Sequence, residues 1–179
     1  MQAFLPNLNL LVAISIIVLQ ALCVLVVLLL ILAKENKFLG FIKKHYLIIG
    51  FLITLAEVLI SLFYSDIIGY APCKLCWLQR IAIYPTCLLF LLAYIKKDRN
   101  ISYYILPLTI FGSLVAIYHN YIYYFGEGIA PCDSSGVSCV QRLVDLFGGY
   151  ISIPSMALTG FVSIFVLLAV NHFYQKDGI

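Results

Sequence analysis

Five long apolar runs dominate the sequence, and short polar segments separate them. The runs cover residues 8–33, 45–64, 78–95, 103–125 and 153–173. A helix needs about 20 apolar residues to cross the roughly 30 Å hydrocarbon core of a bilayer. The pattern therefore predicts an all-α, polytopic membrane protein with five transmembrane helices. We expect the first run to be a retained helix, because it is too long for the core of a signal peptide and no basic segment precedes it.

The composition agrees with this interpretation. Hydrophobic residues make up 64% of the 179 residues and charged residues only 11%, whereas a soluble domain carries about 25% charged residues. No repeat or soluble domain separates from the apolar runs.

The basic residues are distributed unevenly between the polar segments. If five helices alternate in direction, one side of the membrane receives eight of the eleven basic residues. These eight are Lys34, Lys37, Lys43, Lys44, Lys96, Lys97, Arg99 and Lys176. The positive-inside rule then predicts an outer N-terminus and a cytoplasmic C-terminus. The net charge of +3 is on this interpretation a topology signal, and we expect no nucleic-acid partner.

The two polar segments predicted to lie outside, 65–77 and 126–152, each contain a pair of cysteines. Cys73 and Cys76 stand where the first segment gives way to the third apolar run. A helix that starts there favours a thiolate, because unpaired N–H groups and the helix dipole stabilise negative charge. Cys132 and Cys139 flank a turn-like sequence of Asp, Ser and Gly.

The residues after Cys139 have helical spacing. The apolar positions are Val140, Leu143, Val144 and Phe147. This spacing predicts a short amphipathic helix, which either lies in the membrane interface or packs on the bundle as an ordinary loop helix. Pro154 suits the first turn of the last transmembrane helix.

Three interpretations fit two cysteine pairs on one side of a membrane. Four cysteines can bind zinc, although two membrane spans separate the pairs. Two structural disulfides are possible, but a Cys-x-x-Cys ring restrains the unfolded chain little. The third interpretation, which we favour, is a redox relay in which a thiolate of one pair attacks the disulfide of the other. Cys23 and Cys87 lie within apolar runs and are expected to be small buried residues, and we expect no metal.

Several polar residues are candidates for a ligand site. Arg80 follows Cys76 by one helical turn and should face the same side, where it could stabilise a thiolate or donate to a carbonyl oxygen; the alternative is a snorkelling arginine. Glu57 lies near the middle of the second run, where burying an ionisable side chain in the membrane costs free energy. We expect it either to hydrogen-bond another polar residue of the helices or to take part in proton transfer. His119 and Asn120 could exchange protons with a ligand or form interhelical hydrogen bonds.

Aromatic residues gather at the predicted outer ends of the helices. They are Tyr64, Tyr70, Trp77, Tyr121, Tyr123, Tyr124 and Tyr150. Such a distribution is typical of an interfacial belt, and some of these rings could instead line a pocket for a flat aromatic ligand. Gln20 is expected to form a polar interhelical contact.

Residues 71–80, Ala-Pro-Cys-Lys-Leu-Cys-Trp-Leu-Gln-Arg, resemble the signature of the DsbB-type thiol:quinone oxidoreductases, the disulfide bond formation proteins of the bacterial inner membrane. The Cys-x-x-Cys-x-x-x-Arg core of that family matches Cys73, Cys76 and Arg80, and the resemblance covers about residues 45–173. It implies a four-helix transmembrane bundle at 45–179. Residues 1–44 would then add one transmembrane helix and a cytoplasmic loop.

The resemblance also implies an activity. The expected partners are a quinone, ubiquinone or menaquinone, near Cys76, and a periplasmic thioredoxin-fold protein of the DsbA type. In the family's scheme the partner attacks the loop disulfide, which here places the mixed disulfide on Cys132. Electrons then pass through Cys139 to Cys73 and Cys76. Cys76 forms the thiolate complex with the quinone, assisted by Arg80.

Two features depart from the family pattern. The spacing of Cys132 and Cys139 is shorter than in the best-known members and closer to short-loop relatives, and the run at 8–33 is an additional helix. Two other functions remain as alternatives. A protein similar to vitamin K epoxide reductase has a similar bundle, but there the loop cysteines precede the Cys-x-x-Cys motif. A non-catalytic membrane protein braced by disulfides is the other.

Overall fold

The computed structural model describes residues 5–32, 36–126 and 138–174 and contains five long helices. In chain order the elements are α1 (Leu5–Leu32), α2 (Lys37–Leu62), a π-helical turn (Phe63–Ile67), α3 (Lys74–Lys96), α4 (Ser102–Phe125), β1 (Asp145–Leu146), β2 (Ile151–Ser152) and α5 (Ile153–Phe173). All five long helices are long and apolar enough to cross a membrane. The predicted all-α class and the five transmembrane helices are confirmed.

Four of the helices begin earlier than the apolar runs predict, and the differences are largest for α2 and α3. Helix α2 begins at Lys37, because the Asn36 side chain caps it by accepting a hydrogen bond from Phe38 N at 2.9 Å. Helix α3 begins at Lys74 with Cys73 as its N-cap. The expected outer segment at 65–77 is therefore too long at both ends, since the π-helical turn extends the preceding helix to Ile67 and α3 already includes Cys76.

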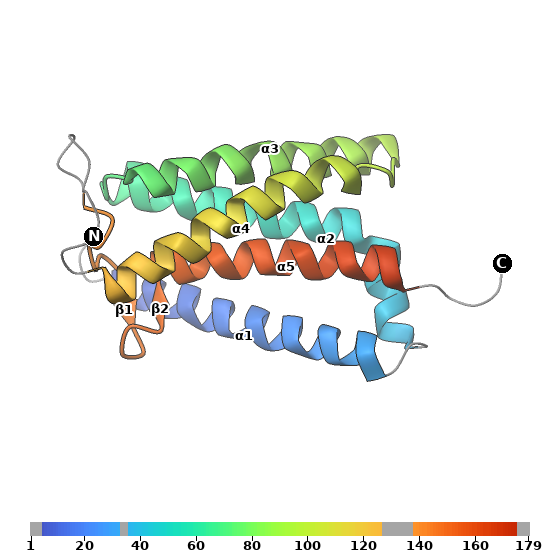
Figure 1. Ribbon diagram of the computed structural model, residues 1–179, viewed down its shortest axis with the longest axis horizontal. Helices are drawn as coiled ribbons and strands as arrows, with labels where there is room; N and C mark the ends of the chain where they lie inside the picture. The colour runs from blue at the N-terminus through green and yellow to red at the C-terminus, as the bar shows by residue number, and fades with distance from the viewer. Residues whose placement is uncertain (1–4, 33–35, 127–137, 175–179) are drawn as a thin grey trace.

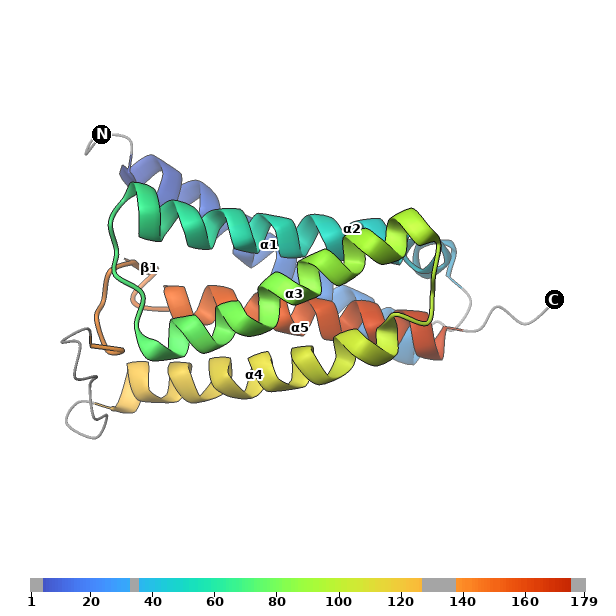
Figure 2. The ribbon, with the colours of Figure 1, turned by 90° about the horizontal axis from the view of Figure 1, so that it is seen from above.

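Helices α2 to α5 pack side by side along the long axis of the molecule, and α1 runs along α5 on the side away from α3 (Figure 1). Figure 2 shows that the link between α2 and α3 lies at the same end of the bundle as the β-hairpin. We call this the thiol end, because Cys73 and Cys76 lie there. The link between α3 and α4 marks the opposite end.

Aromatic side chains pack in the bundle core against glycine residues of the neighbouring helices. Phe90 and Phe161 are both buried in the main apolar cluster. A Cβ atom at Gly50 would overlap the ring of Phe90, and one at Gly112 would overlap the ring of Phe161. Glycine at these positions allows α2 to approach α3 and α4 to approach α5, as small residues do in membrane helices.

The segment after Cys139 is a β-hairpin, so the prediction of a short amphipathic helix there is wrong. Strands β1 and β2 pair antiparallel, with Leu146 opposite Ile151. The turn between them has three consecutive residues with positive φ: Phe147 at 54°, Gly148 at 69° and Gly149 at 89°. An α-helix cannot continue through left-handed backbone, so the apolar side chains of this segment are distributed over a turn.

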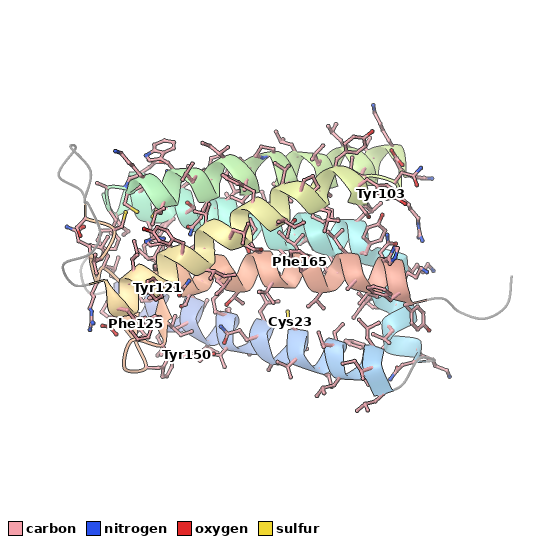
Figure 3. The ribbon with its side chains drawn as sticks, in the orientation of Figure 1. Cys23, Tyr103, Tyr121, Phe125, Tyr150 and Phe165 are labelled. Atoms are coloured by element: carbon pink, nitrogen blue, oxygen red, sulfur yellow. The ribbon has the colours of Figure 1, made fainter. Side chains whose placement is uncertain are left out.

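The aromatic rings expected at the outer ends divide into two groups. Tyr121 and Tyr150 lie at the thiol end together with Phe125, far from Tyr103 at the opposite end (Figure 3). Tyr64, in contrast, is buried, and its ring stacks on Tyr70 with centroids 5.9 Å apart and planes 5° from parallel. This stacked pair faces a cavity, as described below.

Candidate active site

Cys73 and Cys76 meet at the first turn of α3. Cys73 has extended backbone angles, and its Sγ accepts a hydrogen bond from the backbone N–H of Cys76 at 3.5 Å. The two Sγ atoms are 3.3 Å apart. Since the sulfur atoms of a disulfide are about 2.05 Å apart, the structure shows the pair as two thiols that need move only slightly to form a bond.

The two sulfurs face different surroundings. Cys73 is only 4% exposed and lies beside α4 and the segment that leads to the hairpin. Its pKa is raised to about 11, chiefly because its thiol donates a hydrogen bond to Cys76 and also because it is buried, while hydrogen bonds with His119 and Cys139 act in the opposite direction. Cys76 lines a cavity between the helices, whereas Cys73 does not.

His119 joins three elements at the thiol end. It lies on α4, is 2% exposed, and places Nε2 3.9 Å from Cys73 Sγ and 3.2 Å from the carbonyl oxygen of Cys139. On the other side of its ring, Nδ1 is 3.3 Å from Gln79 Nε2. The structure therefore places His119 beside Cys73, although we expected it beside the ligand. Gln79 was missed, although its position three residues after Cys76 puts it on the same face of α3.

Arg80 is fixed inside the bundle. Its Nε donates to Ser61 Oγ at 2.9 Å and its Nη2 to the Ser61 carbonyl oxygen at 3.0 Å. The guanidinium lies 5.3 Å from the centre of the Trp77 ring. With 8% of its surface exposed, Arg80 is no snorkelling residue, and it lines the same cavity as Cys76, as its helical spacing predicts.

Glu57, on α2, is partly buried and also lines this cavity. Its Oε1 atom has no hydrogen-bond partner among the described residues, so the expectation that it satisfies another polar residue is not met for that atom. A Cβ atom at Gly160 would overlap the Glu57 carboxyl group. The glycine thus makes room for a carboxyl group that faces a cavity, and an unpaired buried oxygen of this kind is costly unless a ligand or water reaches it.

The cavity has a volume of about 130 Å³ and is bounded mainly by apolar side chains from α1, α2, α3 and α5. An engineered apolar cavity of about 150 Å³ binds benzene, so this space holds one six-membered ring. The stacked rings of Tyr64 and Tyr70 form part of its wall. The polar groups that reach it include Glu57, Arg80 and the Cys76 thiol.

One group of described residues has the donor atoms of a metal site. Ligand atoms of Cys73, Cys76 and His119 lie within 4.8 Å of one another. Sulfur and imidazole donors of this kind suit Zn²⁺. The four-cysteine zinc site considered above includes Cys132, which lies outside the described residues.

Other predicted residues serve the packing of the helices. Asn120 Nδ2 donates to the carbonyl oxygens of Ala116 and Pro154, both at 2.8 Å, and so ties α4 to α5. Gln20 forms the expected interhelical contact with Thr159. Pro154 lies in the first turn of α5 behind a Ser152 capping box, as predicted.

The cysteines outside the two pairs lie within helices, as expected. Cys87 is buried in α3, as predicted, whereas Cys23 is partly exposed on α1, so the prediction that it is buried is wrong.

A second hollow, of about 570 Å³, lies at the opposite end of the bundle. Basic side chains line much of it: Lys44, His45, Lys97 and Arg99. It contains neither cysteine nor glutamate among its lining residues.

Comparison with known proteins agrees with the geometry of the thiol end. Residues 43–171 match the family described as disulfide bond formation protein DsbB. The chain is 37% identical over 137 residues to a probable disulfide formation protein C 2 of Bacillus anthracis, covering 76% of this chain and 97% of that protein. It is 35% identical over 131 residues to disulfide bond formation protein C of Bacillus subtilis, covering 70% and 91%.

A probable disulfide formation protein of Metapseudomonas resinovorans is 34% identical over 128 residues, covering 70% of this chain and 88% of that protein. No solved structure matches the chain. The match over most of the sequence, the dithiol at the start of α3 and the five membrane-spanning helices lead to one conclusion. The chain belongs to the DsbB family, and it is a multi-pass membrane oxidoreductase with a role in disulfide bond formation.

Proposed function

We propose that the protein is a thiol:quinone oxidoreductase that reoxidises a periplasmic thioredoxin-fold dithiol oxidase and passes the electrons to a membrane quinone. The main support is the placement of the two sulfur atoms at the start of α3. Two sulfurs 3.3 Å apart face in different directions, Cys73 toward Cys139 and Cys76 toward an apolar cavity. A pair so placed can receive electrons from protein thiols and deliver them to a ligand dissolved in the bilayer.

The relay runs through two disulfide exchanges. The reduced partner attacks the Cys132–Cys139 disulfide at Cys132, forms a mixed disulfide there and leaves as a disulfide. The loop dithiol then reduces the Cys73–Cys76 disulfide, with Cys139 attacking Cys73. Each exchange forms one disulfide, breaks another and moves two electrons. The hydrogen bond between Cys139 and Cys73 supports this order of attack.

The residues around the cavity fit a quinone ring. Two N–H groups of Arg80 are held by Ser61, and the guanidinium has further donors for a ring carbonyl oxygen. Glu57 has an unpartnered oxygen in the same cavity. The rings of Tyr64 and Tyr70 offer flat surfaces for stacking. Ubiquinone and menaquinone both offer ring carbonyl oxygens and a flat face, and the cavity volume of about 130 Å³ suits the single ring of ubiquinone better than the two fused rings of menaquinone. Either quinone, when bound, accepts two electrons and two protons from the dithiol.

His119 is suited to stabilise the thiolate that Cys73 forms when it loses its proton. With its pKa raised to about 11, Cys73 keeps its proton at neutral pH, yet closing the disulfide releases that proton. The Gln79 amide donates to Nδ1, and the Cys139 carbonyl oxygen accepts from Nε2, so Nε2 carries the hydrogen. This N–H lies 3.9 Å from Cys73 Sγ. A hydrogen-bond donor beside the sulfur favours the charged form of the thiol, which is the form that attacks a disulfide or a quinone.

The thiol end faces the outside of the bacterial cytoplasmic membrane in this proposal. The uneven distribution of basic residues supports this orientation, as does the stability of disulfides outside the cytoplasm. The redox bundle comprises residues 45–179, and residues 1–44 add a helix and a cytoplasmic loop.

Turnover by purified protein tests the proposal. Protein in detergent is given a reduced thioredoxin-fold partner and a short-chain ubiquinone or menaquinone, and quinone reduction is followed by absorbance. We expect reduction of one quinone per partner disulfide formed, and loss of this activity in Cys73→Ser. Sustained turnover in Cys73→Ser would refute the relay.

Thiol trapping separates the relay from a protein that is merely braced by disulfides. In Cys139→Ser, Cys132 is a free thiol, so this variant is mixed with the oxidised form of the partner. The Cys132 thiolate attacks the partner's disulfide and releases one of its thiols, and the mixed disulfide should accumulate on a non-reducing gel because Cys139 is absent to resolve it. Failure to capture any partner, with all loop cysteines resistant to mild reductant, would favour the brace.

A further inference from the structure

Helix α1 lies outside the residues 43–171 that match the family, yet it contributes to the wall of the cavity. Ile16 is one of the residues that line it. The remaining walls come mostly from α2, α3 and α5. Two of these helices, α2 and α5, are the ones that α1 contacts. The helix therefore borders the space beside Cys76 and Arg80.

We propose that the N-terminal half of α1, residues 5–20, is a side wall that retains the ring of a membrane quinone in this cavity, and that Ile16 limits the size of ring that fits. The inference rests on the proposed function, because it concerns the ligand of the same site. It assigns α1 a role in ligand selection and retention, beyond that of a membrane anchor.

Three hydrogen bonds hold this half of α1 against the rest of the protein, and one of them comes from a residue that lines the cavity. Tyr64, a lining residue, donates from its hydroxyl to Asn9 Oδ1 at 2.7 Å. Gln20 Nε2 donates to Thr159 Oγ1 of α5 at 2.8 Å, and Gln20 Oε1 accepts from the Tyr150 hydroxyl at 2.9 Å. A polar side chain within a membrane helix prefers a protein partner to lipid. These contacts therefore fix both the position and the rotation of α1.

Apolar packing fixes the same face. Val12 and Ala13 are buried in a cluster with Tyr64 and Met156, and Ile16 packs against that cluster. Tyr64 and Met156 also line the cavity. The opposite face of this segment points away from the bundle, since Ile14 is 50% exposed. A single face of α1 thus carries the contacts with the cavity, and this asymmetry provides a matched control.

Ile16→Trp and Ile14→Trp test the inference in the same helix with the same residue change. Binding of a short-chain ubiquinone to the purified full-length protein is measured by the rise in melting temperature with quinone concentration, and by the quinone extracted per protein. We expect Ile16→Trp to weaken binding by about tenfold or more, since filling a packed site typically costs about 1–3 kcal/mol. Ile14→Trp should bind as the wild type does.

Ile16→Ala is a second test that does not depend on whether the bulky tryptophan variant folds. It removes bulk from the wall, so the quinone should dissociate faster than from the wild type while the partner is still captured at Cys132. Equal quinone binding in the wild type, Ile16→Trp and Ile14→Trp would overturn the role of α1 and leave the proposed function standing. No quinone binding to the wild type would overturn the proposed function, and this inference with it.

Discussion

The bundle has a hollow at each end, and the two differ in size and in chemistry. The hollow at the opposite end is larger, about 570 Å³ against about 130 Å³. It is lined by Lys44, Lys97 and Arg99 among others. The smaller cavity, at the thiol end, combines apolar walls with the Cys76 thiol, Arg80 and Glu57.

The size of a hollow alone therefore does not identify it as a ligand site. The basic hollow has the side chains expected where helix ends meet a membrane surface, and no cysteine is among the described residues that line it. The small cavity has mainly apolar walls and a few convergent polar groups beside a reactive dithiol, as ligand sites do. We therefore assign redox chemistry to the thiol end alone.

The largest expected effect is at the dithiol. Cys76→Ser removes the sulfur that faces the cavity, so quinone reduction should fall to background, a loss of about a thousandfold or more. Cys87→Ser changes a buried cysteine farther along the same helix and should keep most of the activity. Steady-state turnover with a reduced partner measures both variants, and equal losses would show that the two cysteines do not differ in function.

The reactivity of Cys73 should depend steeply on pH. A thiol with a pKa of about 11 is almost entirely protonated at pH 8, and its thiolate fraction rises about tenfold per pH unit below the pKa. Alkylation of reduced protein at Cys73, mapped by mass spectrometry, should accelerate about a hundredfold between pH 8 and pH 10. A rate that levels off below pH 9 would disprove the raised pKa.

Two glycines provide a matched pair at the two ends. Alanine at Gly160 would overlap the Glu57 carboxyl group, whereas alanine at Gly40 would meet the Tyr174 hydroxyl at an ordinary 3.5 Å. Gly160→Ala should therefore destabilise the protein by about 1–3 kcal/mol. Gly40→Ala should be neutral or slightly stabilising, because alanine favours a helix.

Unfolding in mixed detergent micelles measures the two glycine variants under the same conditions. Equal stability would mean that Glu57 can move aside without cost, and that its position in the cavity is not fixed.

The smallest effect is expected at the arginines. Arg80→Lys keeps the charge but loses the paired contacts with Ser61, so the KM for quinone should rise about fivefold, equivalent to about 1 kcal/mol. Arg99→Lys, at the basic hollow, should leave this KM unchanged. A change in Arg99→Lys as large as that in Arg80→Lys would remove the distinction between the two ends.

The sequence was sufficient to predict the five long helices, because an apolar run long enough to cross a membrane forms a helix there. It also predicted that Arg80 and Cys76 share a face, because this follows from helical periodicity. The hairpin was not predictable from the same rule. Its apolar residues have helical spacing by chance, and the chain instead bends through Phe147 and two glycines with positive φ.

The partners of the site residues could not be predicted from local spacing. Ser61 and Gln79 contribute through contacts with Arg80 and His119, which depend on how α2 and α4 pack against α3. The cavity itself arises from four helices, one of them α1, which the motif gave no reason to include. Cys132 lies outside the described residues, and its role stays a prediction.

Locating the bound quinone tests most directly whether it binds at the thiol end. A photoreactive quinone analogue is cross-linked to the protein in native membranes, and the labelled peptides are identified by mass spectrometry. We predict labelling of the first turns of α3, which carry Cys76 and Arg80, and of the first half of α5, which carries Met156 and Phe161. Labelling of residues 44–48 and 94–99 around the basic hollow instead would contradict the assignment.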